Sequence, residues 1–182
     1  MFNKYILALI SFATISIVIV SFVLFYQYKY IRDVDYINYL ARTGNFIIIE
    51  NKISAGYNIN TKDRNGMSLL HFSVIDNNNK LFEYCISKGA AIDVVNREGE
   101  TPLITAIQKD NYEMVCNLIK IGANVNVRTK SGYSPILISA MVGNNLIFKK
   151  LLQSGSNIYD CNMTYYVIHE ASLSGNDNRA YA

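Results

Sequence analysis

The chain is poor in the residues from which most catalytic and metal sites are built. It has no tryptophan, two prolines, two histidines and three cysteines. Cysteines without close spacing give neither a disulfide framework nor a metal-ligand pattern, so all three are expected to be small buried side chains (Cys85, Cys116 and Cys161). The sequence also has no nucleophile–base–acid set and no phosphate-binding glycine loop. It therefore predicts a protein that is not an enzyme and that takes no metal, no cofactor and no small-molecule substrate.

Charge is also scarce in this chain. Charged residues make up 17% of it, against about 25% in a usual soluble domain. The net charge of +3 is too small to indicate nucleic acid as a partner, which is typical of domains with a pI above about 9. The hydrophobic share is 51%, and much of it lies in the first 28 residues.

One long apolar run occurs near the N-terminus. No residue from Tyr5 to Tyr28 is charged, and Ile6 to Phe25 gives 20 mostly apolar positions. As a helix this run spans about 30 Å, the hydrocarbon thickness of a bilayer. Tyrosines follow the run, as in an interfacial aromatic belt. We therefore expect a single-pass transmembrane anchor, with the lipid bilayer as a partner through Ile6 to Phe25.

A cleaved signal peptide is the alternative for this segment. Its apolar region would run for about 7 to 15 residues and end at a small-x-small site. The run here is longer, and Phe22 to Tyr26 offers no such site, so an uncleaved anchor is expected. Positive charges flank the two ends almost equally, and the positive-inside rule gives close to a tie. The short N-terminal tail favours a signal-anchor that places the C-terminal part on the non-cytoplasmic side.

Three series of residues recur along the chain with a period of 33. They are Gly66, Gly99 and Gly132; Gly56, Gly89, Gly122 and Gly155; and Asn45, Asn78, Asn111 and Asn144. Independent series at one period indicate a repeat protein, in which the same supersecondary unit recurs along the chain.

Each repeat predicts the same order of elements. A polar turn whose glycine has a positive φ precedes a Ser or Thr at the N-cap and, in two units, a proline at the first helical position (Pro102 and Pro135). The short helix that begins there ends near 77–78, 110–111 or 143–144, at a residue that can adopt the left-handed conformation. A second helix, with apolar residues at helical spacing, then ends at a glycine of the second series.

The segments Gly99–Leu103 and Leu118–Asn126 resemble the ankyrin repeat. The unit at Gly66 lacks the proline of that motif and the unit at Gly132 lacks its histidine. The resemblance implies an all-α solenoid of stacked helix-turn-helix units with β-turn fingers, here preceded by one transmembrane helix. It also implies that His71, at the ankyrin histidine position, is structural and closes hydrogen bonds at the turn. His169 matches the same position with a slip of one residue.

The resemblance divides the chain into six segments. Residues 1–30 are the anchor with its flanks, and residues 31–60 are a degenerate N-terminal capping repeat. Ankyrin repeats follow at 61–93, 94–126 and 127–159. Residues 160–182 resemble a degenerate, incomplete final repeat, in which Thr164 replaces the turn glycine. Because a solenoid needs a polar cap over its last apolar face, this end is frayed, covered by a partner or truncated.

Ankyrin stacks have a concave surface of turn tips and first helices, and the resemblance implies that another protein binds there. By register, the candidate partner-binding residues are Arg64, Met67, Phe72, Arg97, Glu100, Lys130, Tyr133, Ile138 and Met141. Equivalent positions hold Ile75, Thr105 and Gln108. The large apolar residues of the first helices and Tyr133 are expected to be exposed anchors, although Ile138 can instead pack into the stack. The turn tips have a mild basic bias, which indicates either an acidic partner or a solvated rim.

Two functions fit this pattern. The first is a membrane-anchored protein-binding module that acts through the concave ankyrin surface, in its most specific form an inhibitor or immunity-type protein. The alternative is a structural or scaffolding subunit of a membrane complex, in which the transmembrane helix makes specific contacts. Replacing the anchor by an unrelated apolar helix would spare the first function and abolish the second.

Overall fold

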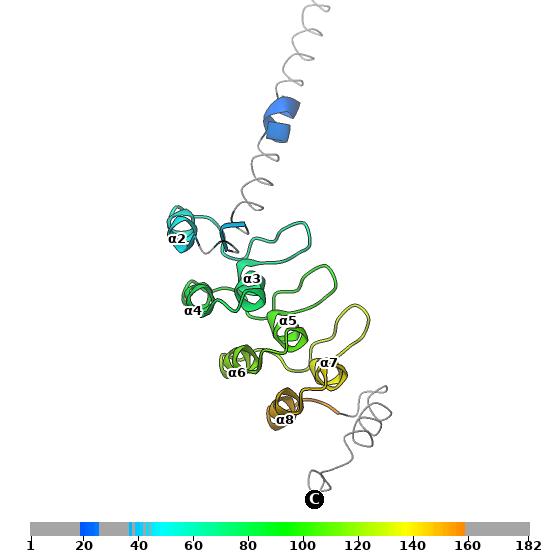
Figure 1. Cartoon of the computed structure of the whole chain (residues 1–182). Coiled ribbons are helices and arrows are strands. Elements are labelled where there is room, and N and C mark those ends of the chain that lie inside the picture. Colours follow the sequence, from blue (N-terminus) through cyan, green and yellow to red (C-terminus); the bar gives the residue numbers. More distant parts are fainter. Residues whose placement is uncertain (1–18, 26–36, 38, 42, 44, 159–182) are drawn as a thin grey trace, which may run out of the picture.

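The computed structural model describes residues 19–25, 37, 39–41, 43 and 45–158 (Figure 1). The regular elements in this part of the chain are helical, as predicted. They are α2 (Phe46–Ser54), α3 (Leu69–Ile75), α4 (Asn79–Ser87), α5 (Pro102–Gln108), α6 (Tyr112–Lys120), α7 (Pro135–Val142) and α8 (Asn145–Gln153).

The helices form two parallel rows. Helices α3, α5 and α7 make one row, and α2, α4, α6 and α8 make the other (Figure 1). A long loop, here called a finger, precedes each helix of the first row and projects on the side away from the second row (Figure 1). Each unit is thus a finger, a first helix and a second helix, which is the order that the sequence predicts.

The first helices begin and end at the residues expected from the sequence. Thr101 caps α5 by accepting a hydrogen bond from the backbone N–H of Ile104 at 3.4 Å, and Pro102 occupies the first turn. The helix ends just before Asp110, whose φ of 56° is in the left-handed region. Asn77 and Gly143 have φ values of 49° and 81° at the equivalent positions, so the predicted left-handed caps are confirmed.

A continuous apolar core runs between the two rows. In the central unit Leu103, Ile104 and Ile107 of α5 are fully buried against Met114 and Leu118 of α6. Burial of each such side chain contributes about 1.5 to 3 kcal/mol. The core extends in both directions, to Ile37, Leu40, Ala41 and Ile49 at one end and Ile147 and Leu151 at the other. The N-terminal segment therefore covers the apolar face of the first full unit.

The expected anchor lies mostly outside the described residues. Residues 19–25 are helical, and their large apolar side chains are exposed. Among the residues that the structure describes, no helix is both long and apolar enough to span a bilayer. The expectations for Cys161, His169 and the final segment 160–182 also concern residues outside the described part.

Candidate protein-binding surface

Each finger is closed by a side chain at its base. In the central finger Oδ1 of Asn96 accepts hydrogen bonds of 2.9 Å from the backbone N–H groups of Glu98 and Glu100. The N–H of Asn96 donates to the carbonyl of Glu100 at 3.0 Å, and Gly99 takes a φ of 77° in the turn. Asp63 stands at the equivalent position of the preceding finger and accepts the same two bonds, whereas Thr129 in the following finger accepts one, from the N–H of Tyr133. Each finger therefore has a fixed conformation before any partner binds.

Adjacent fingers are also bonded to one another. The N–H of Arg97 donates to the carbonyl of Asn65, and the N–H of Lys130 donates to the carbonyl of Glu98, both at 2.8 Å. A Cβ on Gly99 would lie 2.8 Å from the nitrogen of Lys130, closer than real contacts allow. The turn glycines thus permit the close approach of successive fingers as well as the turn itself. Arg97 and Lys130 are held at the tips by this backbone contact.

A second ladder joins the units at the loops between the helix pairs. Side-chain oxygens accept hydrogen bonds from backbone N–H groups 31 residues later, at 2.8 to 3.0 Å. The acceptors are Asn60, Asp93 and Asn126, and the donors are Ala91, Asn124 and Asn157. The acceptors form a further series at a period of 33, which the sequence analysis did not single out and could have found.

The asparagine series at the helix junctions has two roles that the sequence analysis missed. Oδ1 of Asn111 caps α6 by accepting from the N–H of Met114 at 3.0 Å. The amide nitrogen of Asn111 donates to Oδ1 of Asn77 at 2.7 Å, and Asn144 donates to Asp110 in the next unit. One side chain thus caps a helix and ties it to the preceding unit.

His71 has the structural role that the resemblance implied. Its Nδ1 lies 3.2 Å from the backbone nitrogen and 3.0 Å from Oγ of Ser68, and its Nε2 lies 3.1 Å from the carbonyl oxygen of Glu100. Burial lowers the pKa of His71 below 6.5, because desolvation disfavours the charged ring, while the bond to Glu100 acts in the opposite direction. Nδ1 therefore closes the N-terminus of α3 within its own unit, and Nε2 joins α3 to the next finger.

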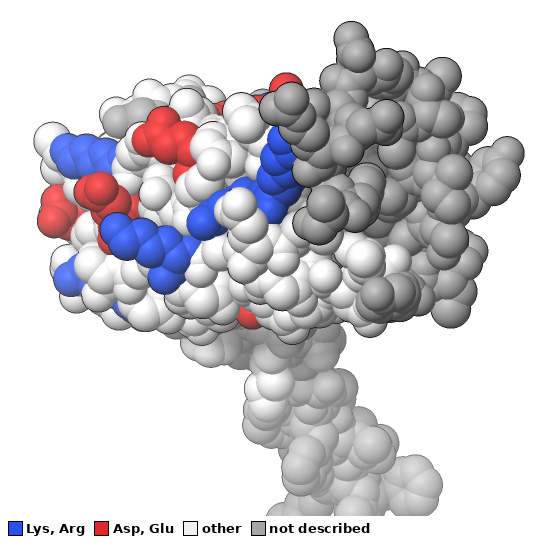
Figure 2. Space-filling model, turned by 90° about the horizontal axis from the view of Figure 1, so that it is seen from below, with Lys and Arg blue, Asp and Glu red and all other residues white. Residues whose placement is uncertain are grey.

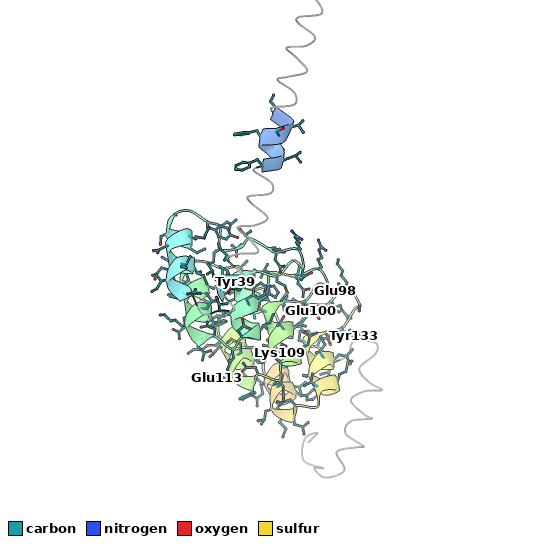
Figure 3. The ribbon with its side chains drawn as sticks, turned by 45° about the horizontal axis from the view of Figure 1, so that its top comes forward. Tyr39, Glu98, Glu100, Lys109, Glu113 and Tyr133 are labelled. Atoms are coloured by element: carbon teal, nitrogen blue, oxygen red, sulfur yellow. The ribbon has the colours of Figure 1, made fainter. Side chains whose placement is uncertain are left out.

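The central unit also holds a carboxylate between the finger and the first helix. Oε2 of Glu100 accepts a 2.8 Å hydrogen bond from Nδ2 of Asn96, and Oε1 accepts a 2.6 Å bond from Nε2 of Gln108 on α5. The amide of Asn96 also lies 3.5 Å from the sulfur of Met67 in the preceding finger. Figure 3 shows Glu98, Glu100 and Tyr133 on the finger side of the stack and Glu113 on the opposite side.

We call this surface the finger face and define it by three rows of equivalent residues. The rows are Arg64, Arg97 and Lys130 at the tips; Met67, Glu100 and Tyr133 at the finger bases; and Ile75, Gln108 and Met141 on the first helices. Tyr133 and Met141 keep 44% and 54% of their surface exposed. The tip residues and Gln108 are exposed, whereas Met67, Glu100 and Ile75 are half-buried.

One comparison with known proteins decides the family. The family profile described as ankyrin repeats (3 copies) matches residues 37–129, about half of the chain. The chain belongs to the ankyrin-repeat family. None of the curated proteins compared with the chain matches it. The sequence-based assignment to ankyrin repeats is thus confirmed, and with it the general expectation of a module that mediates protein–protein interaction.

Two expected surface anchors are part of the core of this ankyrin-repeat protein. Phe72 and Ile138 are only 8% and 7% exposed and pack in the apolar core. The expectation that Phe72 is exposed is wrong, and for Ile138 the alternative of packing into the stack is confirmed. Thr105, at the equivalent position of α5, is buried as well. The reason is geometric. Each first helix contacts its own second helix and the first helices of the neighbouring units, and these contacts leave little of its surface exposed. The exposed members of the candidate set lie in the fingers and at the C-terminal ends of the first helices.

Charge on the ankyrin stack is mixed. Seen from the end at which α7 and α8 lie, the described surface is mostly uncharged, with basic and acidic side chains both present (Figure 2). At the finger tips Arg97 and Lys130 stand beside Glu98. The exposed tips of these two fingers therefore carry two basic side chains and one acidic side chain.

The described cysteines differ in environment. Cys85 is fully buried in α4, and burial raises the pKa of its thiol to about 12. Cys116 on α6 is half-buried, so the expectation of full burial is confirmed for Cys85 but not for Cys116. Within the described residues no three His, Cys, Asp or Glu side chains are placed to hold a metal ion.

Proposed function

We propose that this protein is a membrane-anchored protein-binding module that acts through the finger face. The observation that carries the proposal is the exposure of Tyr133 and Met141 on the face that also holds the cationic tips Arg97 and Lys130. Exposed apolar and aromatic side chains ringed by polar ones mark interaction surfaces, and aromatic and arginine residues are common anchors. The bonded fingers add rigidity, which reduces the entropy lost on binding.

The membrane part of the proposal rests on the apolar run. Ile6 to Phe25 contains no charge, and its described end, residues 19–25, is helical with 47% to 62% exposure of its large apolar side chains. A helix whose whole apolar circumference is exposed is suited to lipid. The proposed orientation places the repeats on the non-cytoplasmic side. In its most specific form the module is an inhibitor or immunity-type protein that holds a toxin or enzyme at the membrane.

Binding rather than catalysis is proposed because the chemistry of the finger face is that of recognition. His71 uses Nδ1 to close its own helix start at Ser68 and Nε2 to bond the next finger at Glu100, so both ring nitrogens have structural partners. Glu100 accepts its side-chain hydrogen bonds from the neutral amides of Asn96 and Gln108, which position the carboxylate. We therefore propose that the chain is not an enzyme.

A matched pair of tyrosines tests the binding surface. Tyr133 on the finger face and Tyr112 on α6 have similar exposures, 44% and 41%, but Tyr112 belongs to the other row of helices. The tagged full-length chain is purified from its native membranes, and co-purifying proteins are quantified. We expect one stoichiometric partner, reduced about tenfold or more by Tyr133→Ala and unchanged by Tyr112→Ala. Equal retention by both variants would contradict the proposed surface.

Two further measurements separate the alternatives for the anchor. A C-terminal reporter active on only one side of the membrane tests the orientation, and activity only inside would reverse the proposed side. Replacement of residues 6–25 by an unrelated apolar helix tests the role of the segment. Preserved partner binding supports the tethered module, whereas its loss favours a scaffolding subunit with specific contacts in the membrane.

A further inference from the structure

The finger bases place three chemically different residues in one row. Met67, Glu100 and Tyr133 are 33 residues apart in successive units and occupy the same position in their fingers. The amide of Asn96 contacts both the sulfur of Met67 and the carboxylate of Glu100, which fixes the first pair. The bond from the N–H of Lys130 to the carbonyl of Glu98 joins the fingers of Glu100 and Tyr133. In this row the carboxylate of Glu100 is therefore flanked by Met67 of the preceding finger and Tyr133 of the following finger, and Figure 3 shows Glu100 and Tyr133 on the same side of the stack.

Neutral groups hold the carboxylate of Glu100 in position. Its two side-chain donors are the amides of Asn96 and Gln108. An ionised carboxylate has about four acceptor positions, and these bonds use one on each oxygen. Glu100 is half-buried, and its remaining acceptor positions are suited to donors from outside the chain.

We propose that Glu100 selects a partner segment that inserts an arginine between Met67 and Tyr133. The inference rests on the proposed function, since it names the chemistry of what the finger face binds. A guanidinium can donate to the carboxylate with its planar fork, stack on the ring of Tyr133 and lay its aliphatic stem against Met67. Lysine offers a point charge without the fork, so arginine is the preferred residue.

The charge of the finger tips predicts which residues flank that arginine in the partner segment. Arg97 and Lys130 are exposed at the tips of the two fingers that hold Glu100 and Tyr133. Acidic side chains flanking the arginine of the partner therefore complement the tips, while the arginine itself complements the finger base. The segment that fits is acidic overall with one arginine at its centre, and this pattern of charges fixes its register on the face.

Synthetic peptides test this preference directly. The probes are fluorescent peptides of about nine residues, about 30 Å when extended, in which acidic residues flank a central position. The central residue is arginine, lysine, glutamine or glutamate, and binding to the full-length chain in detergent is measured by anisotropy. For the wild-type chain we expect arginine to bind best, about tenfold more tightly than glutamine.

Two isosteric substitutions identify the residue responsible. Glu100→Gln keeps an oxygen that can accept from Asn96 or Gln108 but removes the charge, and it should abolish the preference for arginine over glutamine. Glu98→Gln removes the same charge from the tip of the same finger and should leave the preference within about twofold of wild type. Circular dichroism of each variant verifies that the stack is retained.

The outcomes separate this inference from the proposed function. An unchanged arginine preference in Glu100→Gln, equal binding of all four peptides, or no peptide binding at all would each overturn the inference. The proposed function fails by a different result, namely partner co-purification that does not depend on Tyr133. If Tyr133→Ala releases the native partner but Glu100→Gln does not, the finger face is the binding surface and the inference about arginine is wrong.

Discussion

Nε2 of His71 lies 3.1 Å from the carbonyl oxygen of Glu100, so the first helix of one unit is bonded to the finger of the next. On the other side of the ring, Nδ1 is placed to accept from the N–H of Ser68 at 3.2 Å. A ring that accepts at Nδ1 and donates at Nε2 is neutral. Protonation of Nδ1 would set its new hydrogen against the Ser68 N–H, and burial further disfavours the charge.

Stability should therefore fall on mild acidification. Because the folded-state pKa of His71 is lowered, the unfolded chain takes up a proton first as the pH drops below about 6.5. Stability contributed by the neutral ring is present above pH 6.5 and is lost as the pH falls toward the folded-state pKa. Urea unfolding of the full-length chain in detergent at pH 7.5 and pH 5.0 measures the loss.

The variant His71→Gln isolates this residue from other titrating groups. It should be less stable than wild type at pH 7.5 by about 1 to 3 kcal/mol, because buried donors and acceptors lose partners. It should also lose less stability than wild type between the two pH values. An equal loss in both proteins would assign the acid sensitivity to other groups.

Turn glycines should differ in their tolerance of alanine. Gly66, Gly99 and Gly132 all have a positive φ, so each alanine variant is strained by about 1 kcal/mol. At Gly66 and Gly99 the added Cβ also meets the backbone of the next finger at 2.8 Å, whereas no described atom lies within 4 Å of one at Gly132. We expect Gly99→Ala to lower the free energy of unfolding by at least about 1 kcal/mol more than Gly132→Ala. Similar unfolding midpoints for the two would show that the fingers separate at little cost.

The junction asparagines permit a test of cross-unit bonding that preserves the helix cap. Asn111→Asp keeps the oxygen that caps α6 but loses the donor to Asn77. Asn144→Asp keeps the cap of α8 but places a second carboxylate against that of Asp110. We expect Asn144→Asp to be the less stable of the two by about 1 kcal/mol at neutral pH and low salt. Thermal unfolding checks this order, and the difference should shrink when salt is added.

Phe72 and Tyr133 should have opposite mutational phenotypes. Phe72 is buried, so Phe72→Ala should lower the free energy of unfolding by about 3 to 5 kcal/mol through lost burial and a cavity. Tyr133 is exposed, so Tyr133→Ala should change it by no more than about 0.5 kcal/mol while weakening partner binding about tenfold or more. Unfolding and binding measured on the same preparations separate the two effects. A strongly destabilised Tyr133→Ala would place that ring in the fold rather than on a binding surface.

Much of the local structure could be predicted from the sequence because it depends on neighbours close in the chain. A period of 33, a Ser or Thr before each first helix, and turn residues that tolerate a positive φ determine where fingers and helices begin and end. Pro102 fits the first turn of a helix but not its interior, and Gly99 can take the positive φ of the turn, whatever surrounds them. The position of His71 in the ankyrin motif likewise implied its structural role before any contact was known.

Which residues form the candidate surface depends on how the units pack, and this could not be predicted from the sequence. On a short helix such as α3, whether Phe72 is exposed depends on the helices that cover it, and α4 and α5 both pack against α3. The contact of Gln108 with Glu100 joins a helix to a finger, and that of Asn111 with Asn77 joins two units, so neither follows from local pattern. The sequence by itself determined the repeating unit, since caps and turns are local. Only the tertiary structure decided which residues the finger face presents, because exposure is set by the packing of neighbouring units.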